Sequence, residues 1–443
     1  MKRYGAHVIA VLVTMTALAL PGTAPAEEID ELKQQLDAAK QLIQNLEQRI
    51  ERLEQQSTAV SPESAGSTVT DGSKAAKTEG SFSIYGFAQT DLIQDFKRVD
   101  PDWNSSLRPS KIPTEEGIYG DDGETIFSVK QTRLGFLAGY PTTYGDFKTK
   151  IEVDFYGVGS DAGQTTIRPR HFFGELGPVL AGQTHSLFMD INVFPNTIDY
   201  WGPSGMVFLR NPQVRWTPVR GATTFAVALE KPGNDVSWGV DSAPDGAGNL
   251  QSNNDLPDLS ARVKHSGDWG YVQLGGILRK VGFETVGGAA VISDDALGWG
   301  LNLSTNINTF ERDRVILSAV YGEAVANYMN DGGNDLVVVD GQVETLPLLG
   351  AVAYYDHYWN DRLSSSIGYS FTSIDNNDAQ TGDSFKLGQY ASANLLWSPT
   401  EKTLFGVEYL LGKREDNDGE SGDDHRIQFS FKYSFDQRFP FSF

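Results

Sequence analysis

The sequence of 443 residues contains no cysteine, which excludes disulfide frameworks, thiolate metal sites and cysteine nucleophiles. Long apolar runs are also missing: the one run lies at the extreme N-terminus, so a bundle of transmembrane helices is excluded. Basic residues are few, with 36 Lys and Arg against 58 Asp and Glu, for a net charge of −22. Because nucleic-acid binding needs a basic face, this balance argues against a nucleic-acid partner. What is abundant is Gly (46) and aromatic residues (24 Phe, 17 Tyr, 8 Trp), a mixture typical of an all-β protein with many turns.

Residues 1–26 have the pattern of a secretory signal peptide. Lys2 and Arg3 form a charged start, an apolar run follows over residues 8–20, and residues 24–26 (Ala-Pro-Ala) supply a cleavage site. An apolar run of ~13 residues is too short to span a bilayer. The sequence therefore predicts an exported protein; the alternative is that the run forms a buried core helix.

Residues 27–56 carry an unbroken heptad pattern, which predicts an α-helical coiled coil. Ile at most a positions with Leu at most d positions favours two strands. Because about four heptads are marginal as a lone helix, we expect the seam to be buried against copies of itself. The alternative is one amphipathic helix that packs on its own domain. Residues 57–80 are rich in Ser, Thr, Ala and Gly and predict a flexible linker. The seam consists of Ile29, Leu36, Ile43 and Ile50 at a positions and Leu32, Ala39, Leu46 and Leu53 at d positions.

From residue 81 onward the pattern changes to a period of two, which is the period of a β-strand. The clearest stretch is residues 147–155, in which Phe, Thr, Ile and Val alternate with Lys, Glu and Asp. The same alternation returns in residues 363–371 and 427–435. Each stretch has about the length that a tilted strand needs to cross a bilayer.

The connections between these strands alternate strictly between short and long. The short ones are residues 140–146, 176–178, 217–222, 266–270, 309–313, 359–361 and 398–402. The long ones are residues 94–124, 157–166, 184–206, 231–257, 281–296, 327–345, 373–385 and 413–425. A sandwich has no reason to sort connections by length, whereas an outer-membrane barrel has periplasmic turns and long outer loops. We therefore predict an all-β transmembrane barrel of about 16 antiparallel strands over residues 81–443, preceded by the coiled coil.

The C-terminus is rich in alternating Phe residues. Bacterial outer-membrane barrels resemble one another in ending their last strand on Phe, as an address for insertion. Here the chain ends on Phe443, but the better strand pattern already ends at Phe435. The sequence leaves open which Phe is the signal.

Several short motifs follow one another in a fixed order along the chain. They are YGFAQTD at 85–91, QTRLGF at 131–136, RPRH at 168–171, GQTHS at 182–186 with FMD at 188–190, and RNPQVR at 210–215. With the coiled coil and the closing strand, this order resembles the DcaP-like family of trimeric outer-membrane porins. The resemblance implies a homotrimer of sixteen-stranded pores for small organic anions such as dicarboxylates. It also favours three strands in the coiled coil.

Basic residues predominate on the polar faces of the predicted strands, which would line the lumen. An array of Arg and Lys in a narrow pore concentrates anions, and the planar Arg fork suits carboxylates. Arg168 and Arg170, two residues apart on one strand, are spaced to hold both ends of a short dicarboxylate; the alternative is that each pairs with a lumen acid. The inward acids are mainly Glu152, Asp154, Asp258 and Glu408. The basic candidates are Arg133, Lys148, Lys150, Arg168, Arg170, Arg215, Arg262, Lys264 and Arg279.

The third long loop, residues 184–206, is expected to fold into the pore as a constriction loop that carries Tyr200 and Trp201. Asp190, Asp199 and the flanking Arg210 would then help to define the eyelet. The alternative is an ordinary surface loop.

Other chemistry finds little support in the sequence. The six His include no pair at metal-ligand spacing, no Gly-x-Ser-x-Gly motif is present, and no cofactor or enzymatic activity is predicted. The leading hypothesis is passive, anion-preferring diffusion of small organic acids through the outer membrane, with the coiled coil in the periplasm. Expected partners are small anionic solutes, outer-membrane lipid and lipopolysaccharide. Alternatives are a phosphate-selective or sugar porin, and a structural or adhesive trimer tethered through its coiled coil.

Overall fold

The computed structural model describes residues 79–157, 166–288 and 290–442. The chain divides into a unit at residues 1–75 and a second unit at residues 76–443, and only the second contains described residues. The predicted signal peptide and coiled coil, and residues 57–78 of the predicted linker, lie outside the described residues.

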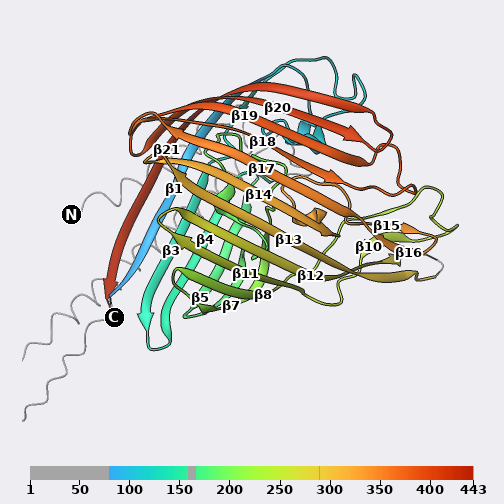
Figure 1. Cartoon of the computed structure of the whole chain (residues 1–443), viewed down its shortest axis with the longest axis horizontal. Helices are drawn as coiled ribbons and strands as arrows, with labels where there is room; N and C mark the ends of the chain where they lie inside the picture. The colour runs from blue at the N-terminus through green and yellow to red at the C-terminus, as the bar shows by residue number, and fades with distance from the viewer. Residues whose placement is uncertain (1–78, 158–165, 289, 443) are drawn as a thin grey trace, which may run out of the picture. The chain divides into compact units, whose positions relative to one another are not determined.

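Sixteen long antiparallel strands form one closed sheet, which confirms the predicted barrel and its strand number (Figure 1). Each strand pairs with the next along the chain, and β21 pairs with β1 to close the ring. The strands are β1 (Glu79–Asp95), β3 (Arg133–Thr142), β4 (Gly145–Asp154), β5 (Arg168–Leu176), β6 (Val179–His185), β7 (Arg210–Val219), β8 (Thr223–Glu230), β11 (Asp258–Gly267), β12 (Gly270–Val286), β13 (Ser293–Thr309), β14 (Asp313–Glu323), β17 (Pro347–Tyr358), β18 (Leu363–Ile374), β19 (Phe385–Thr400), β20 (Thr403–Asp416) and β21 (Ser421–Ser442).

Shorter elements lie in the long connections. Strands β2 (Glu124–Ser128) and β10 (Asn249–Ser252) extend the barrel sheet, whereas β9 (Val236–Trp238), β15 (Leu336–Val339) and β16 (Gln342–Thr345) form a separate sheet. The short 3-10 helices are η1 (Pro101–Trp103), η2 (Pro109–Lys111), η3 (Ile191–Val193) and η4 (Ala326–Tyr328). No helix in the described part of the chain is long and apolar enough to span a bilayer.

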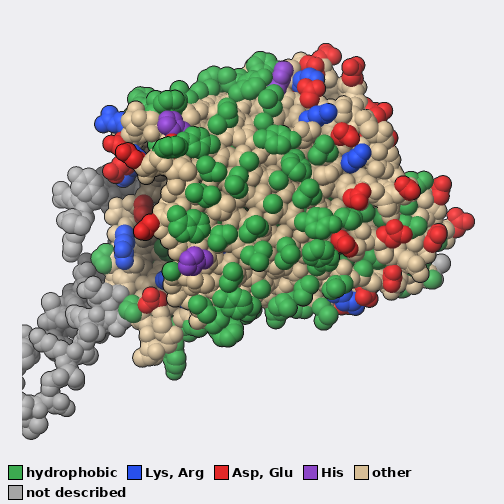
Figure 2. Space-filling view, in the orientation of Figure 1, with side chains coloured by type: hydrophobic (Ala, Val, Ile, Leu, Met, Phe, Trp, Pro, Cys, Tyr) green, Lys and Arg blue, Asp and Glu red, His purple; other side chains and the backbone are tan. Residues whose placement is uncertain are grey.

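The two faces of the strands differ as the alternation predicts. On β21, Phe429 and Phe431 are 47% and 42% exposed on the outer face, whereas Gln428 and Ser430 are buried on the inner face. Figure 2 shows hydrophobic side chains spread over the visible outer face, with acidic side chains gathered toward the end that carries the long loops. Apolar residues therefore face outward and polar residues inward, the reverse of a soluble barrel.

All seven predicted turns occur, but two of the eight predicted loops are shorter than expected. Strand β12 continues to Val286 and strand β13 begins at Ser293. Most of the predicted loop 281–296 is therefore a paired hairpin. Strands β20 and β21 likewise pair through most of the predicted loop 413–425. Gly and Asp do not stop these strands because cross-strand hydrogen bonds beyond the barrel rim outweigh their weak strand preference.

The last strand is longer than its sequence pattern suggests. Strand β21 runs without a break to Ser442 and pairs with β1 from Glu79↔Ser442 to Asp95↔Arg426. Phe435 and Phe439 therefore lie in one strand, while the terminal Phe443 is outside the described residues.

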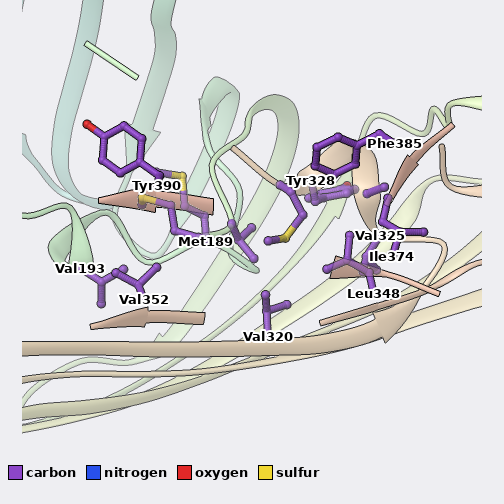
Figure 3. Packing of buried hydrophobic residues seen from close by; sticks show 14 of the residues in the cluster. Met189, Val193, Val320, Val325, Tyr328, Leu348, Val352, Ile374, Phe385 and Tyr390 are labelled. Carbon is purple, nitrogen blue, oxygen red and sulfur yellow. The ribbon is translucent and has the colours of Figure 1, made fainter. Parts of the chain in front are cut away.

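The third long connection, residues 186–209 and called L3 below, lies inside the barrel. Met189 and Val193 of L3 pack against Val320 of β14 and Val352 of β17 (Figure 3). At Gly205 the L3 backbone comes so close to the wall that an added Cβ would lie 2.1 Å and 2.3 Å from backbone carbonyl oxygens. The inward direction predicted for this loop is confirmed by these contacts.

Two further connections also enter the barrel, which the sequence did not predict. Leu107 and Ile112 of the first connection (residues 96–132, L1) are fully buried in the same apolar cluster as Met189. Val325 of the sixth connection (residues 324–346, L6) joins them. Because this cluster includes residues of β14, β17, β19 and β20, the three loops pack against that side of the barrel.

We predict that Gly205→Ala destabilises the barrel, because the new Cβ would meet the carbonyl oxygens of Phe371 and Ala351 and force L3 off the wall. Overpacking of this kind costs about 1–3 kcal/mol, which should lower the midpoint of thermal unfolding followed by circular dichroism. Gly174→Ala is the control, because nothing lies within 4 Å of a Cβ added there. Equal midpoints for the two variants would contradict the close packing of L3.

Candidate functional site

The inner wall formed by β3, β4 and β5 carries a dense group of charges. Glu152 and Asp154 project inward from β4, and both are almost fully buried. Lys150 lies 3.2 Å from Glu152, and the Nε of Arg133 on β3 lies 3.7 Å from the same carboxylate. The two acids thus sit among a larger number of bases, so the local charge of this wall is positive.

A β-bulge in β5 determines how its arginines are presented. Asp154 pairs with Arg168 and Glu152 pairs with His171, so Arg170 is an extra residue without a partner on β4. Pro169, which has no N–H to donate, is suited to such an interruption of the ladder. As a result Arg170 and His171 are adjacent in sequence and both 5% exposed, whereas simple alternation would put them on opposite faces.

Arg168 and Arg170 converge on one carboxylate. The Nη2 of Arg168 and the Nη1 of Arg170 lie 2.8 Å and 2.7 Å from the Oδ2 of Asp154. Arg170 also donates from Nε to Glu152 at 2.8 Å. Neither arginine is free of acidic partners, as holding the two ends of a dicarboxylate would require. Each is paired with a lumen acid, which was the alternative.

Tyr200 connects L3 to this wall. Its hydroxyl donates to the Oδ2 of Asp154 at 2.9 Å and accepts from the Nη1 of Arg170 at 2.9 Å, and it also contacts Arg168. The ring stacks on Tyr156 with centroids 3.8 Å apart. Tyr200, which the sequence predicts as a residue of the constriction loop, thus links L3 to β4 and β5.

Asp190 and Asp199 hold L3 in place, and Asp199 also lines one of the interior cavities. Each is 2% exposed. Asp190 accepts hydrogen bonds from the hydroxyls of Tyr271 and Ser304, at 2.8 Å and 2.7 Å. Asp199 accepts from the backbone N–H of Gly202 at 3.0 Å and of Leu107 in L1 at 3.2 Å, and from the Tyr390 hydroxyl at 3.1 Å. Both acids therefore anchor the loop that was expected to form the eyelet.

The electrostatics of Asp199 follow from its burial. Burial raises the pKa of this carboxyl from 3.8 to about 6, and the hydrogen bonds from Gly202 and Leu107 partly offset that rise. Glu408 of β20 lies next to it and accepts from the backbone N–H groups of Ile198 and Asp199, both at 3.0 Å. L3 is therefore fixed to the wall by acids that bond its amide groups.

Trp201 lies at the junction of three loops. Its Nε1 donates to the carbonyl of Asn330 in L6 at 2.7 Å. The guanidinium of Arg108 in L1 lies 4.2 Å from the ring centroids of both Trp103 and Trp201. Arg108 also pairs with the buried Asp331 of L6 at 3.0 Å. Cation–π contacts and this ion pair thus join L1, L3 and L6 at the mouth.

Tyr200 and Phe208 line two cavities. The first, of about 360 Å³, also contains Arg168, Arg210 and Trp201. The second, of about 340 Å³, is lined by basic and aromatic side chains from β1, β3, β5 and β21 together with L3. Its basic residues are Arg133, Arg170 and Lys432. A third cavity near the turn end of β12 contains Lys264 and Arg314.

Several bases of the interior have no acidic partner. Within residues 79–157, 166–288 and 290–442, no ion pair is formed by six basic side chains. Arg215 is held instead by the side-chain oxygen of Gln213 and the carbonyl of His185. The Nη1 of Arg210 and the Nε of Arg262 are buried without a hydrogen-bond partner in that part of the chain. The six are Lys148, Arg210, Arg215, Arg262, Lys264 and Lys432.

Arg279 differs from the other sequence-predicted candidates. Its side chain has no exposed area and pairs with Asp258 at 3.0 Å and Asp335 at 3.5 Å. It also donates to the carbonyls of Gly233 and Ala324 in the loops. The inward direction from the alternation holds, but Arg279 is covered by L6 and by the fourth long connection (residues 231–257). Arg279 therefore stabilises these loops instead of lining open space.

Lys432 and the histidine pair are the main residues that the sequence reasoning missed. Lys432 lies on the inner face of β21, and its Nζ and the Arg133 guanidinium flank the Phe87 ring at 5.3 Å and 5.1 Å. The alternation of 427–435 already places Lys432 inward. By contrast, no sequence signal brings His171 and His185 together with ring centroids 4.6 Å apart. In the described part of the chain, no group of three or more His, Asp or Glu is arranged to hold a metal ion.

Comparison with known proteins gives a consistent result. The family model "DcaP outer membrane protein" matches residues 14–435. The structure resembles the outer membrane channel DcaP of Acinetobacter baumannii, with a TM-score of 0.71 and 25% identity, covering 82% of this chain and 99% of that one. A comparison with curated protein sequences found no significant match.

Two more distant structures share the fold. The anion-selective porin from Comamonas acidovorans has a TM-score of 0.53 at 10% identity, covering 80% of this chain and all (100%) of that one. The trimer form of OmpT of Vibrio cholerae has a TM-score of 0.51 at 11% identity, covering 80% of this chain and 99% of that one.

We predict a pH dependence of stability that originates at Asp199. Because its pKa in the folded barrel is about 6, above the ordinary 3.8, folding favours the protonated acid. The resulting stability is present in full below pH 3.8 and is lost as the pH rises through about 6. Between about pH 5 and pH 7.5 the wild type should lose about 1 kcal/mol relative to Asp199→Asn, measured by thermal unfolding. Parallel pH profiles for the two proteins would contradict this assignment.

Proposed function

This chain belongs to the DcaP outer membrane protein family, and from that premise we propose that it is an anion-preferring pore for small organic acids. The path runs from the first cavity at the mouth, past Tyr200 and Phe208, into the cavity that contains Arg133 and Lys432. Diffusion through it is passive, because the pore-lining groups bind and orient solutes without any chemical step.

One observation carries the proposal: the acids of the interior have partners, and many of the bases do not. Asp190, Asp199 and Glu408 accept hydrogen bonds that hold L3, and Asp154 accepts from Arg168 and Arg170. The unpaired bases therefore dominate the potential that a solute meets. Between low-dielectric walls such charges attract anions and repel cations more strongly than they would in bulk water.

Selectivity is proposed to arise in two groups of side chains. The first group lies on the β3–β5 wall and consists of Arg133, Lys148, Lys150, Arg168 and Arg170. The second group lies on the wall of β7 and β11 and consists of Arg210, Arg215, Arg262 and Lys264. In the first group Glu152 and Asp154 fix the arginines in position. In the second, Arg210 and Arg262 each have a nitrogen atom without a hydrogen-bond partner in the described chain.

Two basic cavities that share Tyr200 and Phe208 in their linings support short dicarboxylates as solutes. A diacid that passes between these side chains has one carboxylate near Arg210 while the other approaches Arg133 and Lys432. Each end is then close to a cation throughout the passage. Trp201, in the first cavity and tied to Asn330, is proposed to fix the entrance.

The assembly is proposed to be a homotrimer, since the threefold symmetry of a ring of three barrels suits a three-stranded parallel coiled coil. A cleaved signal peptide at residues 1–26 and a periplasmic coiled coil at residues 27–56 complete the proposal. The even strand number supports this topology, because it brings both ends of the barrel to the side of the short turns.

We predict that Arg210→Gln and Lys432→Gln each lower the anion-to-cation permeability ratio, by about twofold per charge, in planar bilayers at low salt. Neither residue forms an ion pair with another described residue, so the substitution removes charge without leaving a buried acid unpaired. Arg220→Gln is the matched control, because Arg220 lies on a turn and pairs with Glu175 at 2.9 Å. If the control lowers the ratio as much as Arg210→Gln does, the selectivity does not come from the pore wall.

We also predict the order of solutes. In proteoliposome swelling, succinate should enter faster than maltose, and succinate should reduce single-channel chloride current more strongly than inorganic phosphate at equal charge concentration. The reason is that two spaced cation groups fit two carboxylates better than one compact anion. Stronger block by phosphate would favour a phosphate-selective pore, faster entry of maltose a sugar pore, and absence of conductance a structural role.

A further inference from the structure

The third cavity, of about 510 Å³, lies at the end of the barrel that carries the short turns. Its wall is formed by the inner faces of four consecutive strands, β11, β12, β13 and β14. Ile191 and Phe194 of L3 line it as well, and both also line the second cavity. The third cavity therefore adjoins the second one along L3, and it is open to a solute that follows the proposed path.

An amide and a guanidinium are neighbours on this wall. Asn308 on β13 and Arg314 on β14 are directly opposite each other in the antiparallel register. Side chains of such a pair are on the same face of the sheet, with Cβ atoms about 4.5–5.5 Å apart. Both residues line the third cavity, so their polar groups border the same space.

Each of these two side chains has one group that is bound and one that is free. The Nη2 of Arg314 is 2.7 Å from the Oδ2 of Asp356 and 3.3 Å from the Tyr358 hydroxyl, whereas its Nη1 forms no hydrogen bond with another described residue. The Nδ2 of Asn308 donates to the carbonyl of Asp268 at 2.9 Å, and its Oδ1 accepts no hydrogen bond in the described part of the chain. A hydrogen-bond donor and an acceptor are therefore available side by side.

Lys264 adds a second positive charge to the same cavity. Its Nζ lies 3.4 Å from the ring centroid of Tyr271, and it forms no ion pair with another described residue. The two nearby acids have partners of their own: Asp190 accepts from the Tyr271 hydroxyl at 2.8 Å, and the fully buried Asp356 pairs with Arg314. Neither acid lines the cavity, so a solute in it meets cations and amides.

We propose that the third cavity binds α-hydroxy carboxylates, an inference that rests on the proposed function of the pore. The carboxylate binds the Nη1 of Arg314, and the hydroxyl next to it donates to the Oδ1 of Asn308. In such an acid these two groups are attached to adjacent carbon atoms, which suits a donor and an acceptor on adjacent strands. Lys264 attracts the second carboxylate of a hydroxy diacid.

The pattern of one acceptor beside two cations distinguishes this occupant from related solutes. A diacid without a hydroxyl binds the cations but leaves the Oδ1 of Asn308 without a donor. An α-amino acid has a donor at the same carbon, but its ammonium is repelled by Arg314 and Lys264. A neutral sugar offers hydroxyls and gains nothing from the positive charge.

The test compares three four-carbon diacids that differ in one substituent of the α carbon. Succinate carries a hydrogen there, malate a hydroxyl and aspartate an ammonium. Each is added, with its carboxyl groups ionised, to the full-length protein in planar bilayers, and its apparent dissociation constant is taken from the reduction of chloride current. Malate should bind about three- to tenfold more tightly than succinate, the factor expected for one additional hydrogen bond, and aspartate more weakly than succinate.

Three variants locate the site. Asn308→Ala should bring the constant for malate to within about twofold of that for succinate and leave the constant for succinate unchanged, because only the acceptor is removed. Lys264→Gln should weaken the binding of both acids alike, since no described acid loses an ion-pair partner. Gln183→Ala is the matched control: this amide lines the first cavity and also donates to a backbone carbonyl, that of Pro169 at 3.1 Å. It should keep the malate-to-succinate ratio of the wild type.

Equal constants for malate and succinate in the wild type would overturn the proposal, as would tighter binding of aspartate than of malate. A malate preference that persists in Asn308→Ala, or that is lost in Gln183→Ala, would refute the site. The reversal potential in a salt gradient, measured in the same bilayers, separates the two proposals. A cation-preferring or non-conducting protein contradicts the proposed function, whereas an anion-preferring pore with equal constants contradicts this inference alone.

Discussion

The pairing of β1 with β21 is the constraint on which the rest of the barrel depends. Their register from Glu79↔Ser442 to Asp95↔Arg426 joins the two ends of the sheet. In hydrocarbon every backbone N–H and C=O needs a partner inside the protein, so an open edge at this position would be very costly. Closure by sixteen strands also fixes the diameter, and a lumen of that width is too large to be filled by strand side chains alone. The loops therefore determine how much of the lumen stays open.

The entry of L3 determines where the charges of the interior are available. A loop inside a barrel brings unpaired backbone N–H groups with it, and these need acceptors. Glu408 and Asp199 supply acceptors near the tip of L3, and Glu230 accepts from the backbone of Leu187 at its start. These three carboxylates therefore accept hydrogen bonds from backbone N–H groups of L3. The bases on the facing wall are left with fewer acids to neutralise them, so the segregation of charge follows from the way the loop is fixed.

Much of the fold was predictable from the sequence because its causes are local. A period of two with outward rings such as Phe429 and Phe431 defines a membrane strand, and alternating connection lengths define the barrel. The same alternation places Arg133, Lys150 and Lys432 inward. The site was less predictable because its geometry depends on contacts between distant segments. The bulge at Arg170, the burial of Arg279 beneath loops and the anchoring role of Asp190 each require knowledge of what lies across the lumen.

The net charge of −22 is a poor guide to the preference of the pore. Residues 94–124 alone contain eight acids against four bases, and Figure 2 shows acidic side chains gathered at the loop end of the barrel. Charges exposed to solvent are screened within about 8–10 Å at physiological ionic strength, so most of these acids do not reach the interior. Arg210, by contrast, lines the same cavity as Tyr200, and its Nη1 has no hydrogen-bond partner in the described chain. A solute at Tyr200 therefore meets a positive potential within a protein that is acidic as a whole.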